Sequence, residues 1–591
     1  MPDLVFEDVS ITYRTSDRDD VAAVSHVSLD LPAGGTLGIA GESGSGKSTL
    51  AMGVLRLLPG NARLEGRILV GDEDVAGLSF GRLRALRWAE ASIVFQGAMH
   101  SLNPVRTVGQ QILEALELHV KDAWKTPEAR KRRLAELLGQ VDLPPEKAKS
   151  YPHELSGGQK QRIMMAMALA CEPDIVIADE PTTALDVIVQ GQILEVLRDL
   201  VTRRGISLLM ISHDLSVLAT ACERIAVMRG GSLVEVGPAA EVCNTPKEAY
   251  TKQLADAFPR IGDPASRRRP VSRKSDPNAP ATEAIDFSAA APILEARNLS
   301  VTYRARGKTV QAVRRVDLAC REGEIVALVG QSGSGKTTLA RTLLGLEQPD
   351  AGGEVRFHGE PLARKGTGLR AFRSEVQLVL QDPAAALNPK ISVYESVAEG
   401  LRVQRFAGDE RARVFESLEA AELSPPERYI RAIPQELSGG QRQRVVIAGA
   451  LAVDPRMIIA DEPVASLDAS ARGEILALIL RLRDELGLSA LVITHDLGLA
   501  WNIADTVAVM YHGEIVERGT VEEVLLDPQH AYTKRLLAAA PSIADAGMAE
   551  GAGADARARA TASAPGPSVG GAGDPAPGDP APVSASAEAA P

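Results

Sequence analysis

The sequence predicts an α/β protein made of two copies of one domain, each with a mainly parallel sheet. Two observations support this prediction. A phosphate-loop pattern, G-x-x-x-x-G-K-[ST], lies between a strand-like apolar run and a helix-forming run, and it occurs at residues 41–49 and again at 330–338. Apolar runs without polar alternation, at 175–178 and 457–460, are typical of parallel strands buried on both faces. Strands that alternate with helical stretches favour the α/β class.

The composition indicates a globular protein. Of its 591 residues, 45% are hydrophobic and 24% are charged, and the net charge is −12. This acidic balance argues against a nucleic-acid-binding surface. No apolar run in the sequence reaches the roughly 18–20 residues that span a bilayer, and the first residues lack a signal-peptide pattern, so we expect a cytoplasmic protein. The cysteines Cys171, Cys222, Cys243 and Cys320 form no C-x-x-C pair, which favours reduced thiols over a metal site.

An internal repeat defines the domain organisation. Ser156 and Ser438, Glu180 and Glu462, and His213 and His495 are all separated by the same number of residues. We expect one domain at 1–261 and a second at 292–541. Between them, residues 262–291 contain several prolines and a basic run at 267–269, which indicates a flexible linker or, alternatively, a contact for anionic lipid. Residues 542–591 are rich in Ala, Gly and Pro, which predicts disorder.

The first part of each half is organised around the phosphate loop. Its glycines let backbone N–H groups surround phosphate oxygens, and the following helix N-terminus adds positive potential. The lysine can reach the β- and γ-phosphates, and the hydroxyl after it can bind Mg²⁺. A Gly/Ser turn with a chance lysine would not recur in this way. The predicted phosphate-binding residues are Gly41, Ser43, Gly44, Ser45, Gly46, Lys47, Ser48 and Thr49 in half one, and Gly330, Ser332, Gly333, Ser334, Gly335, Lys336, Thr337 and Thr338 in half two.

A mostly helical region follows in each half and leads to a second glycine motif. It reads L-S-G-G-Q, and a helix-forming stretch follows it in both halves. Serine and two glycines at a helix start offer free N–H groups to an anion. The motif would be weak alone, but its place between a phosphate loop and an acidic pair, twice, makes it specific. Its residues are Ser156, Gly157, Gly158 and Gln159, and Ser438, Gly439, Gly440 and Gln441.

With these motifs in this order, residues 1–541 resemble the ATP-binding cassette (ABC) family, with two nucleotide-binding domains fused in one chain. The resemblance implies that each domain has a RecA-like P-loop NTPase core, an antiparallel β subdomain and a helical subdomain. It also implies an ATPase that works as a head-to-tail pair. Each ATP would lie between the phosphate loop of one half and the S-G-G-Q of the other, and the linker would keep the halves at high effective concentration.

The resemblance assigns roles to further residues that occur in both halves. Asp179 and Asp461 would hold Mg²⁺, and Glu180 and Glu462 would polarise the attacking water. Gln96 and Gln381 would contact the metal and signal to a partner, and His213 and His495 would contact the γ-phosphate. Asp186 and Asp468 would cross the interface between the halves, and Tyr13 and Tyr303 would stack on adenine. Alone, such a histidine or tyrosine is more often structural, but the shared order in both halves favours function. Both sites keep all these residues, although Gln381 precedes Asp-Pro whereas Gln96 precedes Gly-Ala.

Finer features resemble the oligopeptide and dipeptide importer branch of the family. They are the L-N-P stretches at 102–104 and 387–389, the lead-ins to S-G-G-Q at 151–154 and 433–436, and A-Y-T-K at 249–252 and 531–534. The branch implies two membrane permease subunits and an extracytoplasmic solute-binding protein as partners, with this chain peripheral on the cytoplasmic face. The cysteine pattern argues against an iron–sulfur cluster. An exporter ATPase, a tandem-cassette translation factor and a DNA-repair ATPase are the alternatives, although the short proline-containing linker and the absence of cysteine pairs disfavour the last two.

Overall fold

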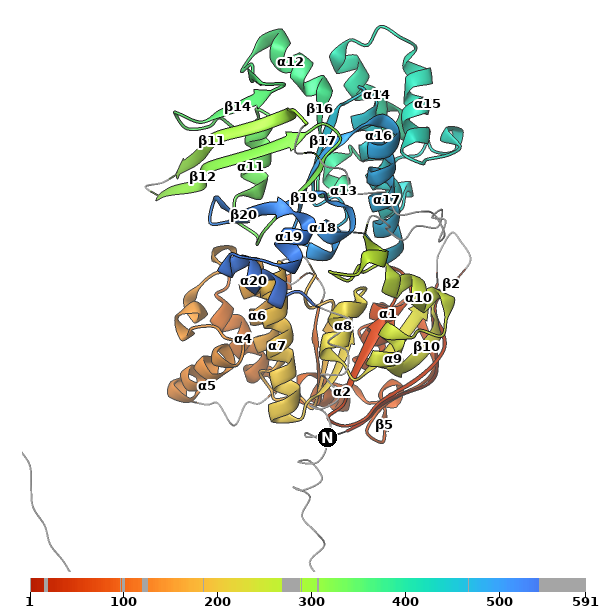
Figure 1. Ribbon diagram of the computed structural model, residues 1–591. Helices are drawn as coiled ribbons and strands as arrows, with labels where there is room; N and C mark the ends of the chain where they lie inside the picture. Colours follow the sequence, from red (N-terminus) through yellow and green to blue (C-terminus); the bar gives the residue numbers. More distant parts are fainter. Residues whose placement is uncertain are drawn as a thin grey trace, which may run out of the picture.

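The computed structural model describes residues 2–14, 20–95, 97, 101–119, 126–183, 185–267, 287, 290–305, 308–465 and 467–541. Gln96, most of the predicted linker and the whole predicted tail therefore lie outside the described residues. The two halves have the same architecture and stack on each other (Figure 1). No helix within the described ranges combines the length and apolar character that crossing a bilayer demands.

The core of half one is a sheet in the order β10-β9-β3-β8-β7-β6. The neighbours from β6 to β9 pair in parallel, and only β10 is antiparallel. Every residue of β3, β7 and β8 is buried, as expected for apolar strands covered on both faces. The strands are β3 (Thr36–Ala40), β6 (Ala91–Val94), β7 (Ile175–Asp179), β8 (Ser207–Ile211), β9 (Arg224–Arg229) and β10 (Ser232–Pro238).

A second, antiparallel sheet in half one has the order β2-β1-β4-β5. Alternate residues of β1, such as Leu4, Phe6 and Ile11, are buried and pack with α1 and the core strands β3, β7 and β8. This packing places the end of β1 next to the phosphate loop. The strands are β1 (Leu4–Tyr13), β2 (Val21–Leu31), β4 (Ala62–Val70) and β5 (Glu73–Asp74).

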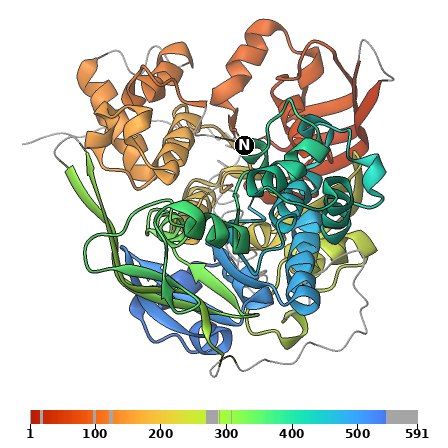
Figure 2. The same cartoon turned by 90° about the horizontal axis from the view of Figure 1, so that it is seen from above.

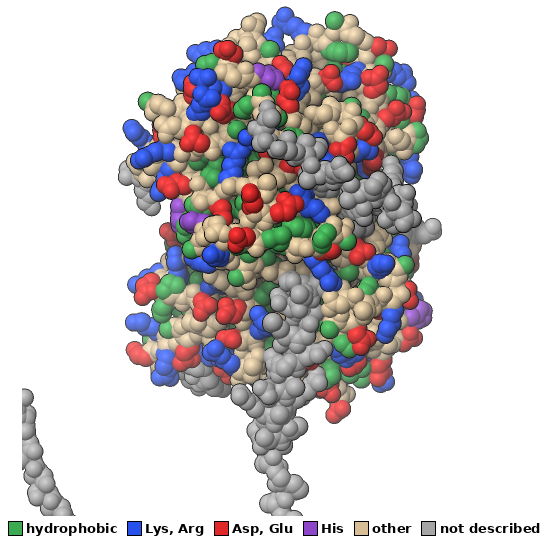
Figure 3. All heavy atoms as spheres, in the orientation of Figure 1, with side chains coloured by type: hydrophobic (Ala, Val, Ile, Leu, Met, Phe, Trp, Pro, Cys, Tyr) green, Lys and Arg blue, Asp and Glu red, His purple; other side chains and the backbone are tan. Residues whose placement is uncertain are grey.

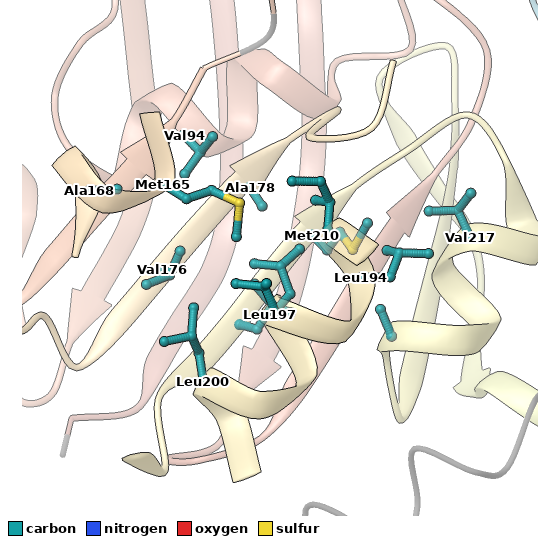
Figure 4. Packing of buried hydrophobic residues seen from close by; sticks show 14 of the residues in the cluster. Val94, Met165, Ala168, Val176, Ala178, Leu194, Leu197, Leu200, Met210 and Val217 are labelled. Carbon is teal, nitrogen blue, oxygen red and sulfur yellow. The ribbon is translucent and has the colours of Figure 1, made fainter. Parts of the chain in front are cut away.

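Helices cover both faces of the core sheet and form a separate helical layer from α4, α5 and α6. Leu137, Leu138 and Val141, at helical spacing in the sequence, are fully buried in this layer. Met165 and Ala168 of α6 and Leu194 and Leu197 of α7 pack against core strands β7 and β8 (Figure 4). The helices are α1 (Lys47–Val54), α2 (Phe80–Ala89), α4 (Val108–His119), α5 (Pro127–Gln140), α6 (Gly157–Ala168), α7 (Val187–Arg204), α8 (Leu215–Ala221), α9 (Ala239–Asn244) and α10 (Ala249–Asp256).

Half two repeats this plan, with sheets in the orders β12-β11-β14-β15 and β16-β17-β18-β13-β19-β20. Its strands are β11 (Pro292–Ala305), β12 (Lys308–Arg321), β13 (Ile325–Val329), β14 (Glu354–Phe357), β15 (Glu360–Pro361), β16 (Val376–Val379), β17 (Met457–Asp461), β18 (Ser489–Thr494), β19 (Thr506–Tyr511) and β20 (Glu514–Thr520). Its helices are α11 (Lys336–Leu343), α12 (Gly366–Glu375), α13 (Pro383–Ala386), α14 (Val393–Gln404), α15 (Glu410–Ala420), α16 (Gly439–Leu451), α17 (Ala469–Leu486), α18 (Leu497–Ile503), α19 (Val521–Leu526) and α20 (Ala531–Ala538).

The two halves lie head to tail. Strands β11 and β12 of half two stand over α4 and α6 of half one, and α14 to α16 of half two stand over the antiparallel strands of half one (Figures 1 and 2). The contact involves α20 with α7 and α10 with α17. On the face shown in Figure 3, acidic and basic side chains are interspersed.

The chain that leaves half one packs against half two. The guanidinium of Arg472 lies 5.4 Å from the ring centre of Phe258, and Trp501 donates its indole N–H to the carbonyl of Asp263 at 3.1 Å. Arg267 forms an ion pair with Glu522 at 3.0 Å. Residues 262–267, the start of the predicted flexible linker, are thus seated on α18 and α19.

Candidate functional site

Each phosphate loop connects the first core strand to a helix and is closed around its own lysine. Gly46 has φ 98°, and a Cβ there would come within 2.3 Å of the carbonyl oxygen of Ala23, so the position requires glycine. Lys47 Nζ donates to the carbonyl oxygens of Gly41 at 2.8 Å and Glu42 at 2.6 Å. These carbonyls occupy the ammonium group that phosphate oxygens would otherwise bind.

Half two repeats this arrangement. Lys336 Nζ donates to the carbonyls of Gly330 at 2.7 Å and Gln331 at 2.8 Å. Burial lowers the pKa of Lys47 and of Lys336 from the usual lysine value, while nearby carboxylates oppose this shift. The two lysines are therefore buried cations that an incoming polyphosphate would stabilise.

A hydroxyl group and a carboxylate meet beside each loop. Ser48 donates to Asp179 at 3.1 Å, and Thr337 donates to Asp461 at 3.1 Å. Burial raises the pKa of both aspartates, and the hydrogen bonds from the hydroxyl groups partly offset it. Hydroxyl and carboxylate oxygens are ligands that Mg²⁺ accepts when phosphates and water supply the rest, so this donor set suits that ion.

The glutamate after each of these aspartates bonds to the predicted histidine. The carboxylate of Glu180 accepts a hydrogen bond from Nδ1 of His213 at 3.4 Å, and that of Glu462 accepts from Nδ1 of His495 at 2.9 Å. Burial acts to raise the pKa of each glutamate, but the hydrogen bond with the histidine, the nearby loop lysine and, for Glu180, the hydroxyl group of Thr183 together lower it. Both carboxylates are thus kept ionised, as a group that orients water requires.

The backbone at these two glutamates is strained. Glu180 has φ 47° and Glu462 has φ 46°, in the left-handed region that side chains other than glycine avoid. Their amides donate to the carbonyls of Ile211 at 2.9 Å and Ile493 at 2.8 Å, which hold the strained turn against the next strand. Strain that is held in this way at the end of a core strand is typical of an active site.

Of Gln96 and Gln381, the two glutamines predicted to contact the metal, the structure places Gln381 in the site. Gln381 donates from its side chain to Glu462 at 2.7 Å. The Asp-Pro that follows it begins α13, because Asp382 accepts from the amide of Ala384 at 2.8 Å. Gln96 lies outside the described residues.

The S-G-G-Q residues form capping boxes at the starts of α6 and α16. Ser156 accepts from the amide of Gln159 at 3.3 Å, and the Gln159 side chain accepts from the amide of Ser156 at 3.2 Å. Ser438 and Gln441 do the same at 3.2 and 2.9 Å. Gln159 and Gln441 therefore fix the starts of α6 and α16. Within the described part of the chain, no hydrogen bond joins either motif to the opposite phosphate loop.

The aspartates that cap the next helices approach the opposite half. Asp186 caps α7 and Asp468 caps α17 through the amides of Val189 and Ala471. The charge of Asp468 acts on Lys47 of half one, and that of Asp186 acts on Lys336 of half two. Each phosphate loop thus lies within electrostatic range of a carboxylate from the other half.

The two predicted adenine-stacking tyrosines lie on equivalent strands, Tyr13 as the last residue of β1 and Tyr303 near the end of β11. The Tyr13 hydroxyl is 3.3 Å from the hydroxyl of Thr49 in the loop helix. Tyr303 has 39% of its surface exposed.

Sequence reasoning missed two residues that touch the loops. The hydroxyl of Tyr250 accepts from the amide of Glu42 at 3.2 Å, and that of Tyr532 accepts from the amide of Gln331 at 2.9 Å. Both belong to the A-Y-T-K stretches, whose sequence indicated only a branch of the family. Their occurrence at the same place in both halves was the signal that could have found them.

Two family models match the chain. One is described as "ABC transporter" and matches residues 24–183 and 313–465. The other, "Oligopeptide/dipeptide transporter, C-terminal region", matches 234–284 and 516–564, and it includes Tyr250 and Tyr532. Both models therefore match twice, once in each half.

Curated relatives align over most of the chain. A protein of Agrobacterium fabrum named "Peptidoglycan transport ATP-binding protein YejF" is 42% identical over 551 residues, which are 92% of this chain and 97% of that protein. "Glutathione import ATP-binding protein GsiA" of Escherichia coli K12 is 40% identical over 563 residues, 91% of this chain and 89% of the relative. A solved structure titled "RNase-L Inhibitor" has a TM-score of 0.56 at 19% identity and covers 88% of this chain and 91% of its own, which shows likeness of fold alone.

Proposed function

This chain belongs to the ATP-binding cassette transporter family, and we propose that it is the ATP-hydrolysing subunit of an importer that carries peptides across the cytoplasmic membrane. It is an ATPase, as members of this family are. The observation that supports peptides most strongly is the oligopeptide/dipeptide C-terminal region, which occurs in both halves. The relatives named for glutathione and peptidoglycan transport agree with a peptide-like solute.

In the proposed mechanism, each phosphate loop binds ATP through its amides and its lysine. Lys47 and Lys336 exchange their carbonyl partners for phosphate oxygens, whose negative charge stabilises a buried cation better than neutral carbonyl groups do. Glu180 and Glu462 hold the attacking water, and His213 and His495 keep those carboxylates ionised and oriented. Catalysis then consists mainly of positioning and charge neutralisation.

Mg²⁺ would be held by Ser48 with Asp179 and by Thr337 with Asp461, and when bound it neutralises charge on the phosphates. The opposite half would complete each site through its S-G-G-Q and its capping aspartate. The approach of Asp468 to Lys47 and of Asp186 to Lys336 supports this pairing.

We further infer that the partners are two membrane permease subunits and a solute-binding protein, with this chain peripheral on the cytoplasmic face. Half two has a groove of about 430 Å³ that includes Leu346, Leu378 and Val403. Leu346 and Val403 are 50% and 63% exposed. The groove runs along β16, which leads directly to Gln381, the side chain bonded to Glu462. A cytoplasmic segment of a permease seated there would be linked to the hydrolytic site through Gln381.

Uptake of labelled peptides by the assembled complex tests the proposed function. Cells that express the permeases with the wild-type chain should accumulate peptide, and cells with the Glu180→Gln, Glu462→Gln chain should not. Val403→Arg should block uptake but leave ATP hydrolysis by the isolated chain intact, because it changes only the groove. Co-purification with ribosomes in place of membrane proteins would favour a translation factor instead, and peptide efflux would favour an exporter.

A further inference from the structure

One hydroxyl group from the C-terminal region of each half touches the phosphate loop of that half. In half one, Tyr250 accepts the amide N–H of Glu42, the second residue of the loop. In half two, Tyr532 accepts the amide of Gln331, which has the same place in its loop. The contact therefore occurs at the equivalent position of both halves.

Each tyrosine is held firmly by its surroundings. Tyr250 is 6% exposed and lies under the guanidinium of Arg229, 4.7 Å from the ring centre. Tyr532 is 3% exposed and stacks on Tyr511 at 4.0 Å. The neighbours differ, yet both rings direct the hydroxyl group to the same loop amide.

A carboxylate fixes the start of each tyrosine-bearing helix. Glu235 accepts from the amides of Lys247 at 3.0 Å and Glu248 at 3.1 Å, just before α10. Glu517 accepts from the amides of Gln529 at 2.6 Å and His530 at 3.2 Å, just before α20. These contacts tie α10 to β10 and α20 to β20, so each hydroxyl group is placed by the whole C-terminal region.

The same helices contact the opposite half. Helix α10 contacts α17, which Asp468 caps, and α20 contacts α7, which Asp186 caps (Figure 1). The carboxylate of Asp468 acts on both Lys47 and Tyr250, and that of Asp186 acts on both Lys336 and Tyr532. Each tyrosine therefore touches its own phosphate loop from a helix that also contacts the aspartate-capped helix of the other half.

The hydroxyl groups of Tyr250 and Tyr532 are protonated and can act as hydrogen-bond donors. Burial, with the nearby carboxylates, raises the pKa of Tyr250 to about 12 and raises that of Tyr532, so both stay protonated at neutral pH. Each hydroxyl group accepts from the loop and can still donate once. Asp468 uses Oδ1 to accept from Ala471 and Ser470, and within the described part of the chain its Oδ2 accepts no hydrogen bond.

We propose that Tyr250 and Tyr532 are positioning residues that link the C-terminal region, the phosphate loop and the opposite half. Each hydroxyl group fixes the backbone of its loop for nucleotide binding and, when the halves close, donates to the aspartate of the opposite half: Tyr250 to Asp468 and Tyr532 to Asp186. This inference rests on the proposed ATPase function and adds a route by which the oligopeptide/dipeptide C-terminal region affects ATP binding.

The first test measures steady-state ATP hydrolysis by the full chain with Tyr250→Phe, Tyr532→Phe or both. Phenylalanine keeps the ring but leaves the loop amide without its acceptor, so the KM for ATP should rise roughly threefold to tenfold, as expected for one hydrogen bond. The kcat should change less than about twofold, because the reacting groups remain. Tyr394→Phe is the control, since it removes a hydroxyl group that donates to Glu410 at 3.0 Å in the helical layer.

An unchanged KM in the double variant would overturn the role in the loop. A lowered melting temperature without a change in KM would also overturn it, because it would show a merely structural role. If the wild-type chain hydrolysed no ATP, the proposed function itself would fail, and this outcome is distinct from the other two.

The second test is a double-mutant cycle across the interface. Asn keeps the capping ability of Asp, so Asp468→Asn should leave α17 in place while it weakens the acceptor. The effects of Tyr250→Phe and Asp468→Asn on KM should be non-additive, whereas those of Tyr250→Phe and Asp186→Asn should add, because these two residues serve different sites. Additive effects for the first pair would overturn the bond between the halves.

Discussion

Thr183 donates its hydroxyl hydrogen to Glu180 at 2.9 Å, whereas half two has Ala465 at the corresponding position. The two candidate bases therefore have different partners. Each glutamate bonds to a histidine, His213 or His495, but only half one has a side-chain donor at this position, because alanine cannot form a hydrogen bond through its side chain. The halves share all their motifs, but their hydrolytic sites are not chemically identical.

This difference predicts a shift in the pH dependence of half one. The hydroxyl group of Thr183 stabilises the ionised form of Glu180 and is one cause of its lowered pKa. Thr183→Ala should raise that pKa, so the acidic limb of the rate profile should move to higher pH. The measurement is single-turnover ATP hydrolysis against pH in the Glu462→Gln background, where half one supplies the remaining activity. In the Glu180→Gln background, Ala465→Thr should move the limb to lower pH, and no movement in either case would contradict the assigned role.

The sequence predicted the features whose residues are close together along the chain. The phosphate loop, the acidic pair at the end of β7 and the S-G-G-Q helix start each depend on a local backbone conformation, and short motifs specify such conformations. Because each motif occurs in both halves, a chance match to the motif could be excluded. The parallel core sheet was predicted in a similar way, from apolar runs that occur once in each half, whereas the antiparallel β subdomain and the helical subdomain were expected from the family resemblance.

Contacts between distant segments could not be predicted in this way. Tyr250 bonds to a loop residue that is far away in the sequence; the repeat of A-Y-T-K could mark the tyrosine as a candidate, but it does not indicate which residue the hydroxyl group contacts. The hydrogen bond from the indole of Trp501 to the carbonyl group of Asp263 likewise depends on how the two halves stack. The bond between Thr183 and Glu180 depends on a local turn, but threonine there has no motif of its own.

Replacing the loop lysines should remove one nucleotide site each. Lys47→Ala and Lys336→Ala delete the cation that faces the phosphates, and the buried lysines have no substitute in the loop. Equilibrium binding of ATP should fall from two molecules per chain to one in either variant and to none in the double variant. Lys131→Ala, on the exposed face of α5, is the matched control and should keep two. Unchanged stoichiometry in the loop variants would show that these lysines are not phosphate ligands.

Separated halves should depend on each other for activity, because each site needs residues from the opposite half. Fragments of half one and half two should be almost inactive when dilute and should recover activity when mixed at high concentration. A half-one fragment that ends at Arg267 should activate half two at lower concentration than one that ends at Ile261. The reason is that Asp263 and Arg267 contact Trp501 and Glu522 of half two.

Two outcomes would count against this account of the halves. Equal activation by the two half-one fragments would show that residues 262–267 add nothing to the pairing. Full activity of a dilute, monomeric half-one fragment would contradict composite sites altogether.

The two strained glutamates provide the most direct test of equal function. Glu180→Gln and Glu462→Gln keep the shape of the side chain but remove the charge that orients the attacking water. Loss of such a group typically lowers the chemical step about 10²- to 10⁴-fold. ATP binding should survive, because the lysine, the loop amides and the metal ligands remain.

In steady-state assays of the assembled transporter, each single glutamate variant should lose a large share of turnover, since both sites have a complete set of residues. The double variant should trap two ATP molecules and hold the halves together. Glu195→Gln, on the exposed face of α7, is the control for the change itself. If Glu180→Gln were silent while Glu462→Gln abolished turnover, half one would be a regulatory site. The Thr183 bond that distinguishes Glu180 from Glu462 would then be the first structural difference to examine, by testing whether Thr183→Ala restores hydrolysis in half one.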